Sequence, residues 1–378
     1  MGGRFIIGVG GGLWLRWPDD LELAVRRSTA QDRPFGAVDG VCPVTKCLTR
    51  PFVLGVAALL PLGSASAAED VKPAACEDHT PHASQMVEVA PGVELEIIDW
   101  GGSGMPMVLL TGLGDNAHVY DNFAFQFTDH FRVIGITRRG FLPSSQPDDG
   151  YDVTTRAADD IAVLDALGIG KAVFVGHSLA GSELSRLGQD YPDRVDKLVY
   201  LDASDLSERF SPDRAEPPGM QPLFTPDTLK SLEAYQAASA RYSAVREPDP
   251  AACHNLVFSA TGAIVDATYP DWVSEKLLAG VGAMPPTDWT KVTAPRLGIF
   301  APFTAEARQA WYFYLDPAQQ AAFDAAWPPI IEWFETTVDK FAAGNEANTH
   351  RLWGAPHYVY IDNEAEVVRW MWEFLGRV

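Results

Sequence analysis

Ser178 stands in a stretch of sequence whose residue types and spacing suit nucleophilic chemistry. The stretch, GHSLAG at positions 176–181, follows a short apolar run and opens into a pattern typical of a helix over about 179–190. A serine on such a strand-to-helix turn projects its hydroxyl from the turn, and small neighbours let the chain segments pass closely. The motif departs from G-x-S-x-G because Ala180 replaces the second glycine. We therefore interpret Ser178 as a nucleophile, against the alternative of an ordinary turn serine.

His357 is the strongest candidate for the general base that a serine nucleophile needs near neutral pH. Of the eight histidines, it alone lies on a predicted loop between the last strand and the last helix. His177 projects from the same tight turn as Ser178, so we expect it to pack there and not to act as the base. His118 is a candidate substrate contact, and a packing or surface role is the alternative.

The hydrophobic pattern predicts the elements that must position these residues. Short apolar strands alternate with helical segments, which indicates a mostly parallel sheet covered by helices on both faces. Asp152 or Thr154 is expected to cap the first helix, which stops at Gly168. Strands are predicted at 86–90, 93–100, 107–112, 131–140, 171–176, 197–202, 295–300 and 350–353, and the last helix at 363–375.

The predicted alternation of strands and helices is interrupted, which divides the chain into a core and an insertion. We expect an α/β core at 86–204 and 293–378. Residues 205–292 contain several prolines and no clear strands, so we interpret them as a mainly helical cap or lid.

Three stretches in the expected order make the chain resemble the α/β-hydrolase superfamily, in particular its serine esterases and lipases. They are VLLTGLGDNAHVYDNF (108–123), TRRGFLPSS (137–145) and GAPHYVYIDNEAEVVRWMWEFL (354–375). The resemblance implies a nucleophile–histidine–acid triad and an oxyanion hole made by the backbone N–H groups of Leu113 and Leu179. Thr111 stands where the family often has a histidine.

The acid of the triad has three candidates. Many members of the superfamily place it after the strand corresponding to 295–300, where Glu306 is the nearest carboxylate here. A subset resembling pancreatic lipases takes it from the end of the preceding strand, where this chain has Asp202. We favour Asp202, and Asp205 and Glu306 remain the alternatives.

The first 80 residues differ in pattern from the rest. Residues 44–68 combine basic residues, a short apolar run and small residues, which predicts a signal peptide cleaved near Ala67 or Ala68 and hence a periplasmic or secreted protein. Residues 1–43 are then interpreted as an over-extended start, and 69–85 as a flexible mature N-terminus. Cys76 and Cys253 would remain after cleavage as an even pair, which allows a disulfide in an oxidising compartment, and the sequence leaves open whether the two are bonded.

Composition limits the partners. The formal net charge of -21 argues against nucleic acid, and no apolar run is long enough for stable membrane insertion. The constellation requires no cofactor, and no standard metal-ligand spacing is seen. We expect a small-molecule carboxylic ester, apolar or uncharged, as substrate. An amidase or C–C bond hydrolase on the same fold, or a binding module with a degraded triad, is the alternative.

Overall fold

The structure is a computed structural model that describes residues 80–210, 227–243, 252–302 and 317–376, all within one compact unit. The predicted leader at 1–68 lies outside the described residues. So do Cys76 and Glu306. Nothing in the described ranges therefore bears on the predicted cleavage site or on the choice of Glu306 as an acid.

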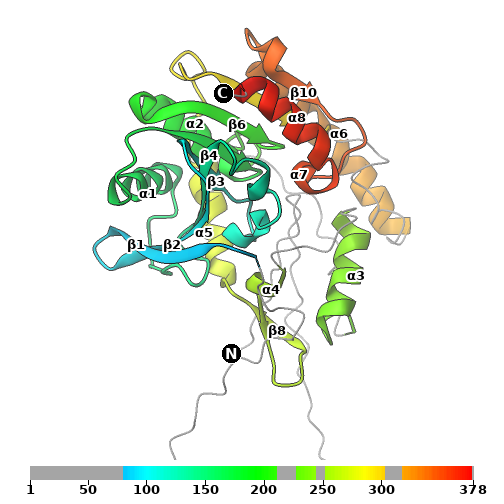
Figure 1. Ribbon diagram of the computed structural model, residues 1–378. Helices are drawn as coiled ribbons and strands as arrows, with labels where there is room; N and C mark the ends of the chain where they lie inside the picture. The colour runs from blue at the N-terminus through cyan, green and yellow to red at the C-terminus, as the bar shows by residue number, and fades with distance from the viewer. Residues whose placement is uncertain (1–79, 211–226, 244–251, 303–316, 377–378) are drawn as a thin grey trace, which may run out of the picture. The chain divides into compact units, whose positions relative to one another are not determined.

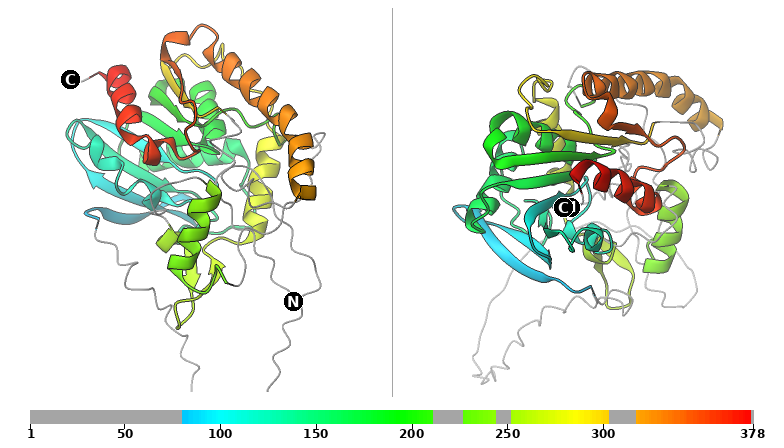
Figure 2. Two further views of the ribbon diagram at one scale, coloured as in Figure 1. Left: turned by 90° about the vertical axis from the view of Figure 1, so that its right-hand side faces the viewer. Right: turned by 45° about the horizontal axis from the view of Figure 1, so that its top comes forward.

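An eight-stranded sheet forms the centre of this unit, in the order β1-β2-β4-β3-β5-β6-β9-β10. The β1–β2 and β2–β4 pairs are antiparallel and the other pairs are parallel. Figure 2 shows the blue hairpin at one edge and the red-orange β10 at the other. The strands are β1 (Ala83–Ala90), β2 (Val93–Gly101), β3 (Met105–Leu110), β4 (Phe131–Thr137), β5 (Ala172–His177), β6 (Val195–Leu201), β9 (Arg296–Phe300) and β10 (Thr349–Arg351).

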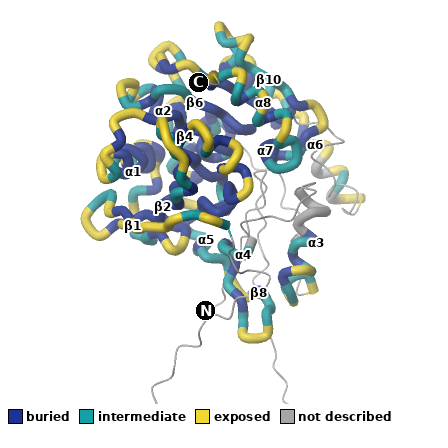
Figure 3. Tube along the Cα trace, viewed as in Figure 1, coloured by how far each residue is buried: buried dark blue, intermediate teal, exposed yellow. Residues whose placement is uncertain are grey.

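Helices cover both faces of the sheet because its central strands are apolar on both sides. In β3, Val108 and Leu110 pack into one core cluster and Met107 and Leu109 into the other. Helices α1 (Val153–Ala166), α2 (Ala180–Asp190) and α6 (Pro317–Ala342) cover the first face. The short helices η2 (Ala117–Tyr120) and η3 (Ala124–Gln126), with α7 (Val359–Asp362) and α8 (Glu364–Leu375), cover the second (Figure 1). Figure 3 shows the central strands as buried.

Local signals in the sequence set the ends of two elements. Asp152 is the N-cap of α1, and its carboxylate accepts a hydrogen bond from the Thr155 backbone N–H at 2.9 Å. Such a cap is worth about 1 kcal/mol. Gly92, at a φ of 73°, makes the turn between β1 and β2 that the sequence predicts.

Strand β1 begins three residues earlier than the hydrophobic pattern predicts. Ala83 pairs with Asp99, and the residues from Ala83 to Met86 are exposed. An edge strand with an exposed start has no apolar alternation that would reveal it in the sequence. The end of the segment predicted to be flexible, 69–85, is therefore ordered as strand from Ala83 onward.

The insertion contains a small sheet as well as helices. Its described helices are α3 (Leu232–Ser243), α4 (Ala252–Asn255) and α5 (Asp271–Gly282), and β7 (Leu256–Phe258) pairs antiparallel with β8 (Ile264–Ala267). Strands of three and four residues are too short to give a readable alternation, which is why the sequence predicted no strand here. In the parts of the chain that the structure describes, no helix is long and apolar enough to cross a membrane.

Candidate active site

Ser178 occupies the turn between β5 and α2, and its backbone is strained. Its φ is 53°, in the left-handed region, where a non-glycine residue costs of order 1–3 kcal/mol. Within the described ranges, Asp202 is the one other non-glycine residue with a positive φ, at 42°. Strain of this kind collects at functional sites. Two of the residues that the sequence analysis selected are therefore also the strained ones.

Close packing around the turn explains the departure from the usual glycine pattern. A Cβ on Gly176 would lie 2.9 Å from the Cβ of Ala180, so the missing side chain at 176 makes room for the alanine methyl. A Cβ on Gly181 would lie 2.4 Å from the backbone nitrogen of Ser204. The position at which helix α2 needs a glycine to approach the neighbouring chain is thus 181, one residue further on.

The structure brings His357 and Asp202 together. Nδ1 of His357 lies 2.6 Å from Oδ2 of Asp202, and both side chains are buried. The other carboxylate oxygen, Oδ1, accepts a hydrogen bond from the Ala301 backbone N–H at 2.8 Å. Asp202 follows β6 directly, and Ala301 follows the neighbouring strand β9. The carboxylate is therefore oriented by a backbone donor as well as by the imidazole.

The alternative acid Asp205 makes different contacts. Its carboxylate accepts hydrogen bonds from the backbone N–H groups of Ser207 and Thr287. The bond from Thr287 joins the two ends of the insertion, 82 residues apart. Asp205 is thus engaged in holding the loops at the base of the insertion.

His177 packs behind the candidate base, as its place on the turn suggested. It is fully buried, its ring centroid is 4.5 Å from that of His357, and its Nε2 lies 3.1 Å from the His357 backbone oxygen. A Cβ on Gly112 would lie 2.9 Å from Nδ1 of His177. The imidazole is therefore wedged between the loop that carries His357 and the loop after β3.

Arg138 sets the orientation of the loop after β3. Its guanidinium donates to the carbonyl oxygens of Thr111 and Gly112 at 2.6 and 2.7 Å, and also to the Thr111 hydroxyl. Because a trans peptide places C=O and N–H on opposite sides, a Gly112 oxygen directed at Arg138 turns the Leu113 N–H away from it. Thr111 itself donates to the Asp115 carbonyl oxygen.

The second candidate oxyanion donor is fixed by helix α2. The Ser178 carbonyl oxygen accepts from the Gly181 N–H at 3.0 Å, so it points along the helix. The same peptide carries the Leu179 N–H on its opposite side, directed out of the helix N-terminus. That end also bears the positive end of the helix dipole, which favours developing negative charge.

A buried ion network ties Arg138 to the helix that follows the nucleophile. Glu183 in α2 accepts from Arg138 at 3.0 Å and from Arg156 of α1 at 2.8 Å. Burial acts to raise the pKa of Glu183, but the two guanidiniums outweigh it and hold that pKa below its usual value. The sequence analysis did not identify this network. Arg138 does lie in the TRRGFLPSS stretch that carries part of the family resemblance.

A second contact missed from the sequence joins the loop after β3 to the histidine loop. The hydroxyl of Tyr358, the residue after His357, donates to Oδ2 of Asp115 at 3.1 Å, and both residues are buried. Asp115 lies two residues after Leu113. The loops bearing the candidate base and one candidate oxyanion donor are thus connected by a hydrogen bond.

Comparison with known proteins places this geometry in a family. A family model described as "alpha/beta hydrolase fold" matches residues 105–232, the segment that carries the loop after β3, the Ser178 turn and Asp202. The chain belongs to the α/β-hydrolase superfamily. The eight-stranded, mostly parallel sheet with helices on both faces is the α/β-hydrolase fold predicted from the sequence.

Curated relatives of this α/β-hydrolase carry several different names. This chain is 38% identical over 31% of its length to a non-heme chloroperoxidase of Streptomyces lividans, with 44% of that protein covered. It is 32% identical over 36% of its length to a 2-(acetamidomethylene)succinate hydrolase of Mesorhizobium japonicum, with 49% covered. A bifunctional esterase/perhydrolase of Acinetobacter calcoaceticus is 35% identical over 31% of this chain, with 44% of that protein covered. The matches thus span less than half the length of these relatives.

Solved structures match a larger part of the α/β-hydrolase chain. The structure of E-2-(acetamidomethylene)succinate hydrolase superposes with a TM-score of 0.58 at 18% identity, covering 78% of this chain and 99% of that one. An α/β-hydrolase from Novosphingobium aromaticivorans gives 0.56 at 21% identity, covering 79% of this chain and 99% of that one. At such identities the likeness establishes the fold alone.

The insertion of this α/β-hydrolase packs directly on the candidate site. One apolar cluster contains Leu179 beside Tyr269 and Val273 of the insertion, and Leu113 packs against the same cluster. Both residues whose amides are candidate oxyanion donors therefore have apolar side chains facing the insertion. Their surroundings are apolar, which bears on the chemistry of a substrate.

The remaining site residues have clear positions. His118 is buried in η2 and bonds through Nδ1 to Asp121 at 3.0 Å. Its ring also stacks on that of His254, with centroids 3.7 Å apart. Cys253 is disulfide-bonded, while Cys76, the candidate partner from the sequence, lies outside the described residues.

Proposed function

We propose that the protein is a serine hydrolase that cleaves a carboxylic ester through Ser178, His357 and Asp202. The observation that carries the proposal is the pair of strained residues, Ser178 and Asp202, together with the 2.6 Å contact between Asp202 and His357. A nucleophile on a strained turn and a carboxylate-oriented imidazole are the parts that acyl transfer requires. The esterase named among the curated relatives supports the ester as the bond cleaved.

The reaction divides into two acyl-transfer steps. His357 removes the hydroxyl proton as Ser178 Oγ attacks the ester carbonyl, and the Leu113 and Leu179 N–H groups donate to the resulting oxyanion. His357 returns the proton to the alkoxide leaving group, which departs as the alcohol and leaves an acyl-enzyme. Water then attacks the acyl-enzyme with His357 again as base, releasing the carboxylic acid and restoring Ser178.

Asp202 acts on the imidazole and not on the substrate. Bonded to Nδ1, it holds the tautomer that leaves Nε2 as the proton acceptor and stabilises the imidazolium when it forms. Because the Ala301 amide orients the same carboxylate, its position does not depend on the charge of His357.

An apolar or uncharged substrate fits the surroundings of the site. Leu113 and Leu179 lie with Tyr269 and Val273 in an apolar cluster contributed by both core and insertion. Charged groups are costly to bury in such surroundings without a partner. We expect uncharged acyl or alcohol groups to be preferred.

A second candidate is hydrolysis of an amide or a C–C bond. It is favoured by the related 2-(acetamidomethylene)succinate hydrolase of Mesorhizobium japonicum, whose substrate contains an acetamido group. A binding module with an inactive triad is the third candidate, and a serine-directed phosphonate would fail to label it.

We also propose that the protein is exported to the periplasm or secreted. The pattern at 44–68 is that of a signal peptide. The disulfide at Cys253 supports the proposal, because disulfides form and persist in oxidising compartments. N-terminal sequencing of the protein from the exported fraction tests it, and a mature chain that still contains Trp14 would contradict it.

The function is tested with nitrophenyl esters and matched anilides of increasing acyl length. We expect ester hydrolysis in the wild type, and in Ser178→Ala a loss of about 10⁴-fold or more together with loss of phosphonate labelling. Faster turnover of anilides than esters would select the amidase. A folded wild type that neither turns over nor labels would select the binding module.

A further inference from the structure

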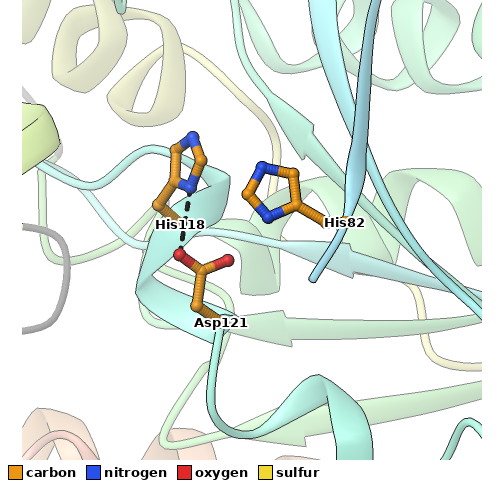
Figure 4. Close-up of side chains that lie close together, drawn as sticks. All are labelled: His82, His118 and Asp121. Atoms are coloured by element: carbon orange, nitrogen blue, oxygen red, sulfur yellow. Dashed lines mark hydrogen bonds and ion pairs between the residues drawn. The ribbon is translucent and has the colours of Figure 1, made fainter. Parts of the chain in front are cut away.

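Three side chains of types that can bind a metal meet where the insertion and β1 adjoin η2. His82 precedes β1, His118 lies in η2, and Asp121 caps the C-terminus of η2. One ligand atom from each lies within 4.8 Å of the others. Figure 4 shows the two imidazole rings side by side with the Asp121 carboxylate next to both. From this geometry we propose a binding site for a divalent transition-metal ion, Zn²⁺ in the first instance.

The ligand set and its spacing suit Zn²⁺. Two imidazole nitrogens and one carboxylate oxygen are a zinc donor set, with a fourth position left for water or another oxygen. Tetrahedral Zn²⁺ with bonds of about 2.0–2.1 Å places its ligand atoms about 3.3 Å apart. The separation of 3.0 Å between His118 Nδ1 and Asp121 Oδ2 is already close to that edge length. The remaining ligand separations are within 4.8 Å, so these side chains would move closer together to bind the ion.

The surrounding residues hold two of the ligands in place. Trp100 Nε1 donates to Oδ1 of Asp121 at 2.9 Å, so Oδ2 is the oxygen turned toward His118. The ring of His254 stacks on that of His118 at an interplanar angle of 13°, which fixes the plane of the imidazole. Hydrogen bonds and packing that orient ligands in this way raise metal affinity.

The charge around the cluster also favours a cation. His118 lies between two buried carboxylates, Asp121 at Nδ1 and Glu96, whose Oε1 is 3.9 Å from Nε2. Glu96 is further bonded by Thr137 at 2.8 Å. Buried carboxylates are costly unless a positive charge compensates them, and a divalent ion would supply that charge.

An ion at this site would replace the contact between His118 Nδ1 and Asp121 Oδ2 by bonds from both atoms to the metal. The titratable groups that face His118 are Asp121, Glu96, His82 and His254. Metal ions bind the unprotonated imidazole, so protons and the ion compete for the same ring nitrogens. The ion would join the segment before β1 to η2, and its effect would be on stability. The site does not rest on the proposed hydrolase function.

Calorimetric titration of the full chain, prepared without a histidine tag, with Zn²⁺ and with Co²⁺ tests the proposal. We expect one ion per chain, a visible Co²⁺ spectrum typical of low coordination number, and a Tm that rises by several degrees with metal concentration. Asp121→Asn keeps an oxygen that can accept from Trp100, and His82→Gln alters a half-buried residue, so both variants should fold.

Both variants should lose stoichiometric binding and the Tm rise, while His130→Gln, an exposed histidine elsewhere, should retain them. Absence of stoichiometric binding in the folded wild type would overturn the site. Equal affinity in wild type, Asp121→Asn and His82→Gln would also overturn it, by assigning the ion to other residues. Ester hydrolysis is measured in parallel, so failure of the metal site and failure of the hydrolase proposal are separate results.

Discussion

Arg138 holds the carbonyl oxygen of Gly112 at 2.7 Å, and through that one peptide it fixes the direction of the Leu113 N–H. The arginine need not touch substrate to influence the reaction. It positions a donor, and it is in turn fixed by Glu183 on the helix that follows Ser178. The two candidate oxyanion donors are therefore connected through a buried ion network.

Replacing Arg138 by lysine should lower kcat while leaving KM nearly unchanged. Lysine cannot bond both carbonyl oxygens and Glu183 together, so the Leu113 amide loses its fixed direction. Loss of one oxyanion donor costs about 10²–10³-fold in kcat. Steady-state kinetics on a nitrophenyl ester measure the split, and phosphonate titration counts active sites. A full count of active sites with wild-type kcat would contradict the positioning role, whereas Arg132→Lys, at a half-exposed ion pair, is the neutral control.

Asp202→Asn should lower kcat by about 10⁴-fold with the fold intact, because an amide at this position favours the wrong imidazole tautomer. Asp205→Asn is the matched control, since Asp205 bonds loop amides, and we expect its kcat within a fewfold of wild type. The two variants are compared by steady-state kinetics and circular dichroism. Near-normal turnover in Asp202→Asn would return the role of acid to Asp205 or Glu306.

Tyr358→Phe should reduce kcat by about tenfold, equivalent to about 1.4 kcal/mol, with little change in KM. The variant keeps the ring and removes the hydroxyl that bonds Asp115, so the loops of His357 and Leu113 lose their connection. Tyr191→Phe serves as the control because Tyr191 lies at the end of α2, away from both loops. Active sites are again counted by phosphonate titration. If kcat and the number of phosphonate-labelled active sites fall by the same factor, Tyr358 contributes to stability alone.

Glu183→Gln should destabilise the protein at pH 7 and much less below pH 4. The two guanidiniums keep the pKa of Glu183 below its usual value despite burial. Its stabilising contribution is therefore present above the unfolded pKa of about 4.3 and is lost as pH falls through the lower, folded value. Breaking a buried pair costs about 3–5 kcal/mol, measurable by urea unfolding. A difference from wild type that remains as large well below pH 4 as it is at pH 7 would argue against this account.

Asp160→Asn should leave stability at pH 7 unchanged or raise it by about 0.5–2 kcal/mol. Burial, reinforced by the nearby carboxylates of Glu183 and Asp159, raises the pKa of Asp160 well above its usual value. The folded state thus favours the protonated acid, and stability is lost as pH rises from the unfolded toward the folded pKa. A neutral amide removes that loss.

Asp159→Asn should change the free energy of unfolding in the opposite direction to Asp160→Asn. Asp159 accepts two hydrogen bonds of 2.7 Å from Arg139, and its loss leaves a buried guanidinium without this anion. We expect destabilisation of about 3–5 kcal/mol. Thermal and urea unfolding of both variants between pH 5 and pH 8 provide the test, and a destabilised Asp160→Asn would show that its carboxylate is ionised in the folded protein.

The hydrophobic pattern of single segments predicted the central strands and their order along the chain, but it did not predict the short elements. β3, β5 and β6 are apolar runs buried on both faces, and such runs are readable one segment at a time. The β7–β8 pair is stabilised by packing on α3, a contact between distant segments that no local alternation encodes. The boundaries placed at 205 and 292 stay predictions.

The sequence likewise predicted only the part of the candidate site that local motifs mark. Ser178 and His357 stand in motifs that mark them locally, and Asp202 was chosen from its place after a strand. The parts that orient them, Arg138 with Glu183 and Tyr358 with Asp115, depend on contacts across 45 and 243 residues. His82 and His118 are 36 positions apart, so their meeting at Asp121 could not be predicted from ligand spacing either.

The bond from the Ala301 amide to Asp202 has an evolutionary consequence. Strands β6 and β9 are parallel neighbours, with Leu201 opposite Ile299, so their ends lie about 4.8 Å apart. A carboxylate rooted on either strand can span that gap and reach the same imidazole. Moving the acid from one strand end to the other would therefore take two substitutions, one at each end, with the histidine and serine left in place. In this chain β6 supplies the charge and β9 supplies the amide that steadies it.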